Sequence, residues 1–287
     1  MRKTMRLLTI FIFALTGIVS NSMAMSVSVG DTIRYQCPMK CEGEKTYDHP
    51  GTCPVCGMDL EKMEANNDPA EKVSNVKITG AMLNVMHLGL LYGTINLDTI
   101  SNKKHLYGLG PVEYLKGEIL IDDGKSYVSK MAEDGSIVME ETYKVKAPFF
   151  VSENVDRWEE ISIPDYIVNL QQLETFLDAT TKNHSRPFAF RLNATIENAA
   201  IHIVNLPDGT AVNSPEDVQQ HQHHFIVKNT DAELIGFFST QHQGIFTHHD
   251  TYVHIHMMTA DKKKMGHLES FVIKKGTAKL FLPAESK

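Results

Sequence analysis

From about residue 75 onward, the chain is dominated by short runs in which apolar and polar residues alternate. Three such runs are separated by Asp-Asp-Gly and Glu-Asp-Gly: Gly117–Ile121, Tyr127–Met131 and Ser136–Met139. These separators are typical of tight turns, so the pattern predicts a meander of antiparallel strands. Phe188–Asn193 and Ala199–Asn205 continue the same pattern and predict two further strands.

Two segments have helical signals instead. In Pro164–Thr181 apolar residues recur at helical spacing, at Ile167, Leu170, Leu173, Phe176 and Leu177. Ser214-Pro-Glu-Asp reads as an N-cap, a first-turn proline and acidic residues at the positive end of a helix dipole. The sequence therefore predicts an α/β fold in which β structure dominates.

The N-terminus has the features of an export signal. Arg2, Lys3 and Arg6 precede an apolar run, Leu7–Val19, and the small residues of Ser22-Met23-Ala24 supply a cleavage point. An apolar run of about 13 residues is shorter than the roughly 20 needed to span a bilayer. We therefore expect residues 1–24 to be a signal peptide and the mature chain to be periplasmic or secreted, without a membrane span.

Charge and length narrow the class of protein further. The 287 residues carry a net charge of −7, and the three basic residues of the signal would leave −10 when removed. An acidic chain without a basic block argues against nucleic acid or an anionic membrane as the main partner. The polar stretch 64–74 is typical of a linker, so we expect one domain over residues 75–284 and a small module over 35–63.

The small module contains all four cysteines, Cys37, Cys41, Cys53 and Cys56. They form one C-x3-C and one C-x2-C pair separated by eleven residues. Close pairs let thiolates converge on one ion, and Cys-Pro-x-Cys-Gly is a spacing found in four-thiolate sites. We favour a metal site, and two disulfides, which export permits, are the alternative.

The stretch Tyr35–Leu60 resembles the heavy-metal binding module of bacterial metal-efflux proteins. The shared pattern is Tyr-x-Cys-Pro-Met, followed by Pro-Gly-x-Cys-Pro-x-Cys-Gly-Met-x-Leu. Where that family usually has a histidine, this chain has Lys40-Cys41, and an added thiolate suits zinc as well as softer ions. Met39 and Met58 are either thioether ligands for Cu+ or Ag+, or packing residues of a small core.

Near the C-terminus, three histidines are predicted to share one face of a sheet. His254 and His256 alternate with apolar residues on a strand, and a hairpin would bring His267 beside them. Three imidazoles with open positions are the ligand set of a catalytic zinc. Buried structural histidines are the alternative. A second H-x-H, His221 and His223, lies in a polar helix end and is interpreted as a solvated face.

Around these histidines the chain resembles α-acetolactate decarboxylases. The resemblance rests on Gly236-Phe-Phe-Ser, the H-x-H pair with Gly266-His267 eleven residues later, the Gly117-Glu118 strand, and Arg191 in Phe-Ala-Phe-Arg-Leu. It covers about residues 75–282 and implies an α/β, β-rich body with extended mixed sheets. The family often dimerises, so a homodimer is among the arrangements that the resemblance allows.

The resemblance also implies a reaction. The substrate would be acetolactate, a small 2-hydroxy-3-oxo acid, and the products acetoin and CO2. Zn2+ would be held by His254, His256 and His267, Arg191 would bind the substrate carboxylate, and Glu118 would donate the proton. Without the resemblance, Glu118 and Arg191 read as ordinary exposed strand charges.

The chain departs from the family at several positions. The family has a threonine seven residues before the glutamate, an aspartate two before it and an acidic residue in a C-terminal tail. Here those places hold Pro111, Lys116 and, as a weak substitute, Glu285. A second hypothesis is therefore a non-catalytic protein that binds or traffics metal ions on a decarboxylase-like scaffold.

Overall fold

The computed structural model describes residues 34–37, 45–54, 58–63 and 74–284. The predicted signal peptide and nearly all of the predicted linker lie outside these residues. In the N-terminal module, three short strands form an antiparallel sheet in the order β2-β1-β3. They are β1 (Arg34–Gln36), β2 (Thr46–Tyr47) and β3 (Glu61–Met63).

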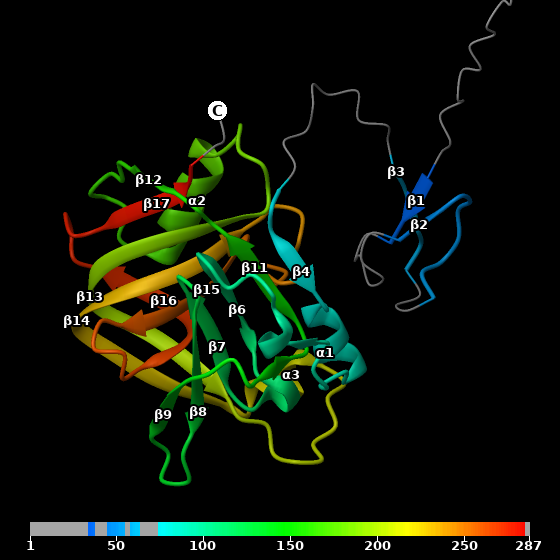
Figure 1. The fold of residues 1–287 in the computed structure, drawn as a ribbon, viewed down its shortest axis with the longest axis horizontal. Helices are drawn as coiled ribbons and strands as arrows, with labels where there is room; N and C mark the ends of the chain where they lie inside the picture. The colour runs from blue at the N-terminus through cyan, green and yellow to red at the C-terminus, as the bar shows by residue number, and fades with distance from the viewer. Residues whose placement is uncertain (1–33, 38–44, 55–57, 64–73, 285–287) are drawn as a thin grey trace, which may run out of the picture. The chain divides into compact units, whose positions relative to one another are not determined.

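The body contains two six-stranded sheets (Figure 1). The first has the order β4-β11-β6-β7-β8-β9 and carries the predicted meander in β7, β8 and β9. Its strands are β4 (Lys77–Thr79), β6 (Leu106–Pro111), β7 (Glu118–Asp122), β8 (Lys125–Met131), β9 (Ile137–Glu141) and β11 (Phe150–Asn154). A small two-stranded sheet pairs β5 (Ile95–Asn96) with β10 (Lys146–Ala147).

The second sheet has the order β12-β17-β13-β14-β15-β16. Its strands are β12 (Trp158–Ile161), β13 (Phe188–Val204), β14 (Gln222–Phe238), β15 (Val253–Thr259), β16 (Met265–Ile273) and β17 (Lys279–Pro283). The predicted β-rich α/β class is confirmed. All ladders between these described strands are antiparallel rather than mixed in direction.

Strand β13 replaces two predicted strands with one continuous strand of 17 residues. It pairs with β14 along its length, with β17 over Arg191–Asn193 and with β16 over Ile196–His202. Because β16 also pairs with β15, the strands β13, β14, β15 and β16 form a closed circuit. Two shifts in the register with β16 let β13 bend into this circuit, and the continuous partner β14 keeps the intervening residues extended.

Alternation along β13 separates two apolar cores. Phe188, Phe190 and Leu192 lie in a cluster with Leu173 and Leu177 of helix α2 (Leu170–Thr180). Ala189 points the other way, into a cluster that joins the second sheet to Leu109, Leu120 and Val151 of the first. The body is therefore two sheets packed face to face, with α2 covering the outer face of the second sheet.

Helix α2 begins six residues later than predicted. The side chain of Asn169 caps it by accepting a hydrogen bond of 3.0 Å from the backbone N–H of Gln172. The other predicted start is confirmed, because Ser214 and Asp217 form a capping box at helix α3 (Pro215–Gln219). Among the described residues, no helix has the length and apolarity to cross a bilayer.

Helix α1 (Met82–Leu88) and helix α3 close one end of the two sheets (Figure 1). Met82 and Val85 of α1 and Val218 of α3 share an apolar cluster with Phe149 and Val204. This cluster borders the histidine-bearing strands, because Val204 lies two residues from His202 on β13. The two helices thus cover the end of the sheets at which the histidines gather.

Candidate metal centre and active site

The hairpin predicted for the C-terminal histidines is confirmed. Strands β15 and β16 pair with His256 directly opposite His267, and His254 lies two residues away on the same face. One ring nitrogen from each histidine lies within 4.8 Å of the others. The pairing of β15 with β16 therefore brings three potential metal ligands together.

The three rings form a group that could hold a metal ion, and two of them have buried nitrogens without a hydrogen-bond partner among the described residues. His256 is fully buried, and neither of its ring nitrogens has a hydrogen-bond partner among the described residues; the same holds for Nδ1 of His254. Burial lowers the pKa of His256 to about 3 and holds the pKa values of His254 and His267 well below the usual range. Neutral imidazoles with unsatisfied buried nitrogens fit a metal such as zinc.

Glu118, at the start of β7, faces this centre from the other sheet. Its Oε2 lies 3.6 Å from Nε2 of His256, and its Oε1 accepts a hydrogen bond of 3.2 Å from the backbone N–H of Val204. Burial raises the pKa of Glu118 to about 8, against a smaller lowering by the Val204 hydrogen bond. The carboxyl group is therefore protonated at neutral pH and can donate a proton into the space beside the histidines.

A cavity of about 40 Å³ lies between Glu118 and the histidines. This volume has room for about three water molecules, so it suits only a small ligand. A neighbouring hollow of about 100 Å³ shares Met82, Met86, Val218, Gln222 and His248 with the cavity. Pro111, which pairs across the hairpin with Glu118, lines the cavity without offering a hydroxyl group.

His202 and His248 line the same cavity and were missed by the sequence analysis. The ring of His202 stacks on that of His267 with centroids 4.7 Å apart, and the rings of His248 and His267 meet edge to face at 5.5 Å. Neither residue belongs to a short motif. Their proximity depends on pairing between distant strands, which no local pattern in one sequence reveals.

Arg191 does point away from Phe188, Phe190 and Leu192 as alternation predicts, but its guanidinium is engaged elsewhere. Its Nε donates a hydrogen bond of 2.8 Å to Glu233 Oε1, and Nη2 contacts the same oxygen. The guanidinium also lies near the rings of Tyr107 and Trp158. Arg191 is not among the described residues that line the cavity, so its predicted role in binding a carboxylate stays a prediction.

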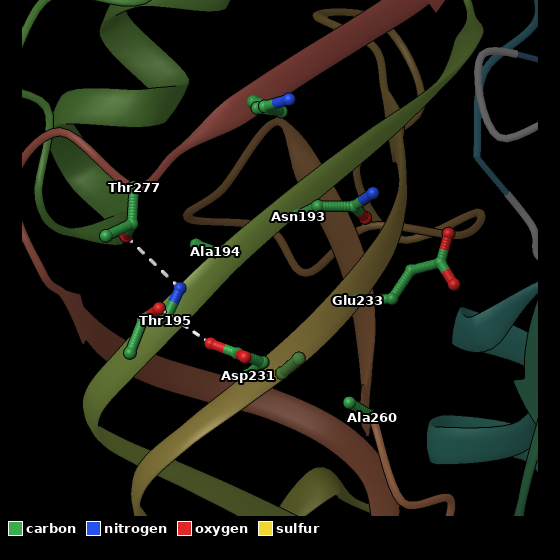
Figure 2. Close-up of a pocket in the computed structure, with 9 residues that line it drawn as sticks. Asn193, Ala194, Thr195, Asp231, Glu233, Ala260 and Thr277 are labelled. Atoms are coloured by element: carbon green, nitrogen blue, oxygen red, sulfur yellow. Dashed lines mark hydrogen bonds between the residues drawn. The ribbon is translucent and has the colours of Figure 1, made fainter.

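Glu233 lies at a second hollow, which is wide and open (Figure 2). Here the Thr195 hydroxyl donates to Asp231 Oδ1 at 2.6 Å, and the Thr195 backbone N–H donates to the Thr277 hydroxyl at 3.2 Å. The described residues that line this hollow include no histidine or cysteine. It is a polar surface depression on β13 and β14, separate from the histidine cavity.

In the N-terminal module, the structure describes two of the four cysteines. Cys37 and Cys53 are both buried in one small apolar cluster with Leu60. The backbone N–H of Cys53 donates to the carbonyl of Met58 at 2.7 Å. Met58 is 42% exposed and lies outside this cluster, whereas Cys41, Cys56 and Met39 lie outside the described residues.

Together, these features define a β-rich protein with a buried three-histidine centre and a facing acid, preceded by a cysteine module. The family model described as alpha-acetolactate decarboxylase matches residues 79–284, and the heavy metal binding domain model matches residues 34–63. The chain belongs to the alpha-acetolactate decarboxylase family and carries an N-terminal heavy metal binding domain.

The relatives found by sequence and structure are distant. The alpha-acetolactate decarboxylase of Lactococcus lactis subsp. cremoris is 22% identical over 202 residues, which are 69% of this chain and 80% of that protein. The structure of alpha-acetolactate decarboxylase from Bacillus subtilis strain 168 is 18% identical, with a TM-score of 0.59 over 74% of this chain and 86% of that one.

A third match comes from Staphylococcus aureus. It is described as a protein of unknown function similar to alpha-acetolactate decarboxylase, and it is 16% identical with a TM-score of 0.58. The match covers 72% of this chain and 84% of that one. At these identities the structural likeness establishes the fold.

Proposed function

We propose that the protein is an exported, zinc-dependent decarboxylase that converts acetolactate to acetoin and CO2. One observation carries this proposal: a buried, neutral three-histidine cluster and a protonatable glutamate face each other across a small cavity. Membership of the decarboxylase family supplies the substrate class, a small 2-hydroxy-3-oxo acid.

The residues that would hold the zinc ion are His254, His256 and His267. When bound there, the ion supplies a Lewis acid that stabilises negative charge developing on the ketone and hydroxyl oxygens of the substrate. The chain contributes neutral imidazoles whose unsatisfied nitrogens are already close together, and it excludes bulk water from them by burial. The pre-formed cluster limits the reorganisation that ion binding requires.

Glu118 would act as the proton donor. When the carbon–carboxylate bond breaks, CO2 leaves and the bonding electron pair stays on the carbon that carried it. That carbon must gain one proton to give acetoin, and the protonated carboxyl of Glu118 is the acid on the cavity wall that can supply it. The Val204 N–H holds one carboxyl oxygen, which leaves the other directed toward the histidines.

The experiment is an acetoin assay on the purified mature protein with racemic acetolactate. We expect zinc-dependent acetoin above the spontaneous rate, and we expect His254→Ala to abolish it. His249→Ala is the matched control, because His249 is exposed and lies outside the cluster. No acetoin above background with zinc bound would exclude the assigned reaction, and undiminished activity after complete zinc removal would exclude its dependence on zinc.

A second candidate function is metal binding and transfer without catalysis. Two observations favour it: Arg191 is paired with Glu233, and Pro111 places no hydroxyl at the cavity wall. In this case the N-terminal domain would hold Zn2+, Cu+ or Ag+ at its cysteines. Competition with Cu+ and Zn2+ chelators measures the affinity of the cysteines for each ion. Only micromolar or weaker binding at the cysteines would argue against metal handling.

Export is part of the proposal and is supported by the sequence of residues 1–24. Fractionation of cells expressing the full chain tests this: we expect the protein in the periplasm or medium, shortened at its N-terminus. Full-length protein confined to the cytoplasm would contradict it.

A further inference from the structure

Four histidines form one continuous row across the closed circuit of strands. His224 of β14 pairs with His202 of β13, His202 pairs with His267 of β16, and His267 pairs with His256 of β15. Neighbouring ring centroids along the row are 5.9, 4.7 and 5.5 Å apart. Two members of this row, His267 and His256, belong to the three-histidine centre, and they form the buried end of the row.

Glu269 lies beside the other end of the row. It follows His267 by two residues on β16, at one of the two shifts in the register with β13, and its carboxylate reaches the histidine row. Its Oε1 is 3.0 Å from Nδ1 of His202, and its Oε2 is 3.1 Å from Nδ1 of His224. The carboxylate of Glu269 therefore lies beside the Nδ1 atoms of both imidazoles.

We propose that His202, His224 and Glu269 form a second cation site, specific for borderline divalent ions such as Zn2+ and distinct from the three-histidine centre. Two histidines and one glutamate are an established ligand set for zinc. The three ligand atoms lie within 4.8 Å of one another. Tetrahedral coordination with bonds of about 2.0–2.1 Å separates ligand atoms by roughly 3.3 Å. The two gaps between the carboxylate and the imidazoles, 3.0 and 3.1 Å, need to widen by only a few tenths of an ångström, and the two ring nitrogens are at most 4.8 Å apart.

Gln222 completes this arrangement. Its side-chain amide nitrogen lies 3.2 Å from Nε2 of His202, on the opposite side of the ring from Glu269. Metal binding at Nδ1 requires this amide to turn over, so that its oxygen accepts a hydrogen bond from Nε2–H and the Nδ1 lone pair is left for a cation. Such outer partners commonly fix the tautomer of a metal-binding histidine.

Exposure distinguishes this site from the buried centre. The side chains of His224 and Glu269 are 51% and 32% exposed, whereas His202 is nearly buried. A cation there keeps open positions for water and exchanges directly with solvent. Since His202 also lines the cavity and stacks on His267, the second cation would lie next to the first site.

The alternative is a network in which Glu269 simply accepts hydrogen bonds from two imidazoles. Zinc counting decides between the two. The full mature chain and its variants are dialysed against buffered 10 µM free Zn2+, and bound zinc per chain is measured by mass spectrometry. The cysteine module is the same in every variant, so the zinc that it binds cancels when the zinc counts of two variants are compared.

We expect His224→Ala to bind about one zinc fewer per chain than the wild type, and His254→Ala to lose a different one, so that the double variant loses two. Glu269→Gln keeps the hydrogen-bonding shape and should weaken binding of the second zinc at least tenfold by titration. His223→Ala is the matched control, because His223 is the exposed neighbour of His224 and projects from the opposite face of β14.

Equal zinc counts for the wild type, His224→Ala and His223→Ala would overturn the proposal. So would a Glu269→Gln variant with unchanged affinity. His224 is exposed, so its truncation is not expected to unfold the chain, and circular dichroism verifies this. The zinc count does not depend on acetoin formation, so failure of the proposed reaction would leave this test intact.

Discussion

Glu118 and His256 come to within 3.6 Å of each other, Oε2 to Nε2, although they are 138 positions apart in the chain and lie on different sheets. Face-to-face packing of the two sheets is what creates this contact. Glu118 and the three candidate metal-binding histidines therefore lie on different sheets. Either can be substituted without changing the sheet that carries the other.

Replacing Glu118 with glutamine removes the transferable proton but keeps the side-chain shape. We expect acetoin formation to fall by a factor of about 100 to 10,000, the usual contribution of general acid catalysis, with zinc content unchanged. Glu140→Gln, on the exposed surface of β9, is the control. Full activity of Glu118→Gln would show that the proton comes from another group.

Glu153 on β11 predicts a pH dependence of stability. Its buried carboxyl accepts a hydrogen bond of 2.8 Å from the backbone N–H of Ala189, and burial raises its pKa to about 7. A carboxyl with a raised pKa in the folded state contributes stability below its unfolded value of 4.5, and this contribution is lost as the pH rises through 7.

The free energy of unfolding of Glu153→Gln should therefore equal that of the wild type near pH 4. At pH 8.5 it should exceed the wild-type value by on the order of 2–3 kcal/mol. Urea denaturation at the two pH values measures this difference. Glu160→Gln, on the exposed strand β12, should show no such pH dependence. If the difference in the free energy of unfolding between Glu153→Gln and the wild type narrowed as the pH rises, this would contradict the raised pKa of Glu153.

Gly266 lets β13 and β16 approach each other beside the histidines. A Cβ atom at this position would lie 2.6 Å from the carbonyl oxygen of His202, which is backbone and cannot swing away. Gly266→Ala should lower the free energy of unfolding by about 1–3 kcal/mol and reduce the zinc bound by the histidines. Thermal melting and zinc counting on the same sample check this, and a variant unchanged in both would refute it.

The pair formed by Arg191 and Glu233 predicts strong coupling. Both side chains are about four-fifths buried, so removing either partner leaves a poorly solvated charge. Each of Arg191→Met and Glu233→Gln should cost about 2 kcal/mol, and the double variant should cost less than their sum. A double-mutant cycle from urea denaturation measures the coupling, and strict additivity would show that the pair contributes little.

The cysteine domain should act independently of the histidine centre. Cys53→Ser removes a buried residue of the predicted thiolate site. We expect tight Cu+ binding to be lost and acetoin formation to be unaffected. The reciprocal variant, His254→Ala, should keep Cu+ binding. If Cys53→Ser also abolished acetoin formation, the two regions would be functionally linked.

The sequence predicted what depends on local patterns. Alternation identified the meander and the hairpin that pairs His256 with His267, and the capping residues located α3. It could not predict that His202 and His224 join the same row, because that depends on pairing between strands far apart in the chain. Likewise, strand alternation puts Arg191 on the face opposite Phe190 and Leu192, but it could not foresee Glu233 as the diagonal cross-strand neighbour of Arg191.

The length of β13 has a consequence for how the protein reaches its native state. This one strand holds Arg191 near one end and His202 near the other, and both depend on the same alignment with β14. A slip by a single residue would turn both side chains to the wrong face at once. Misaligned chains are therefore unable to assemble the histidine row, so ion binding would select for correctly folded molecules.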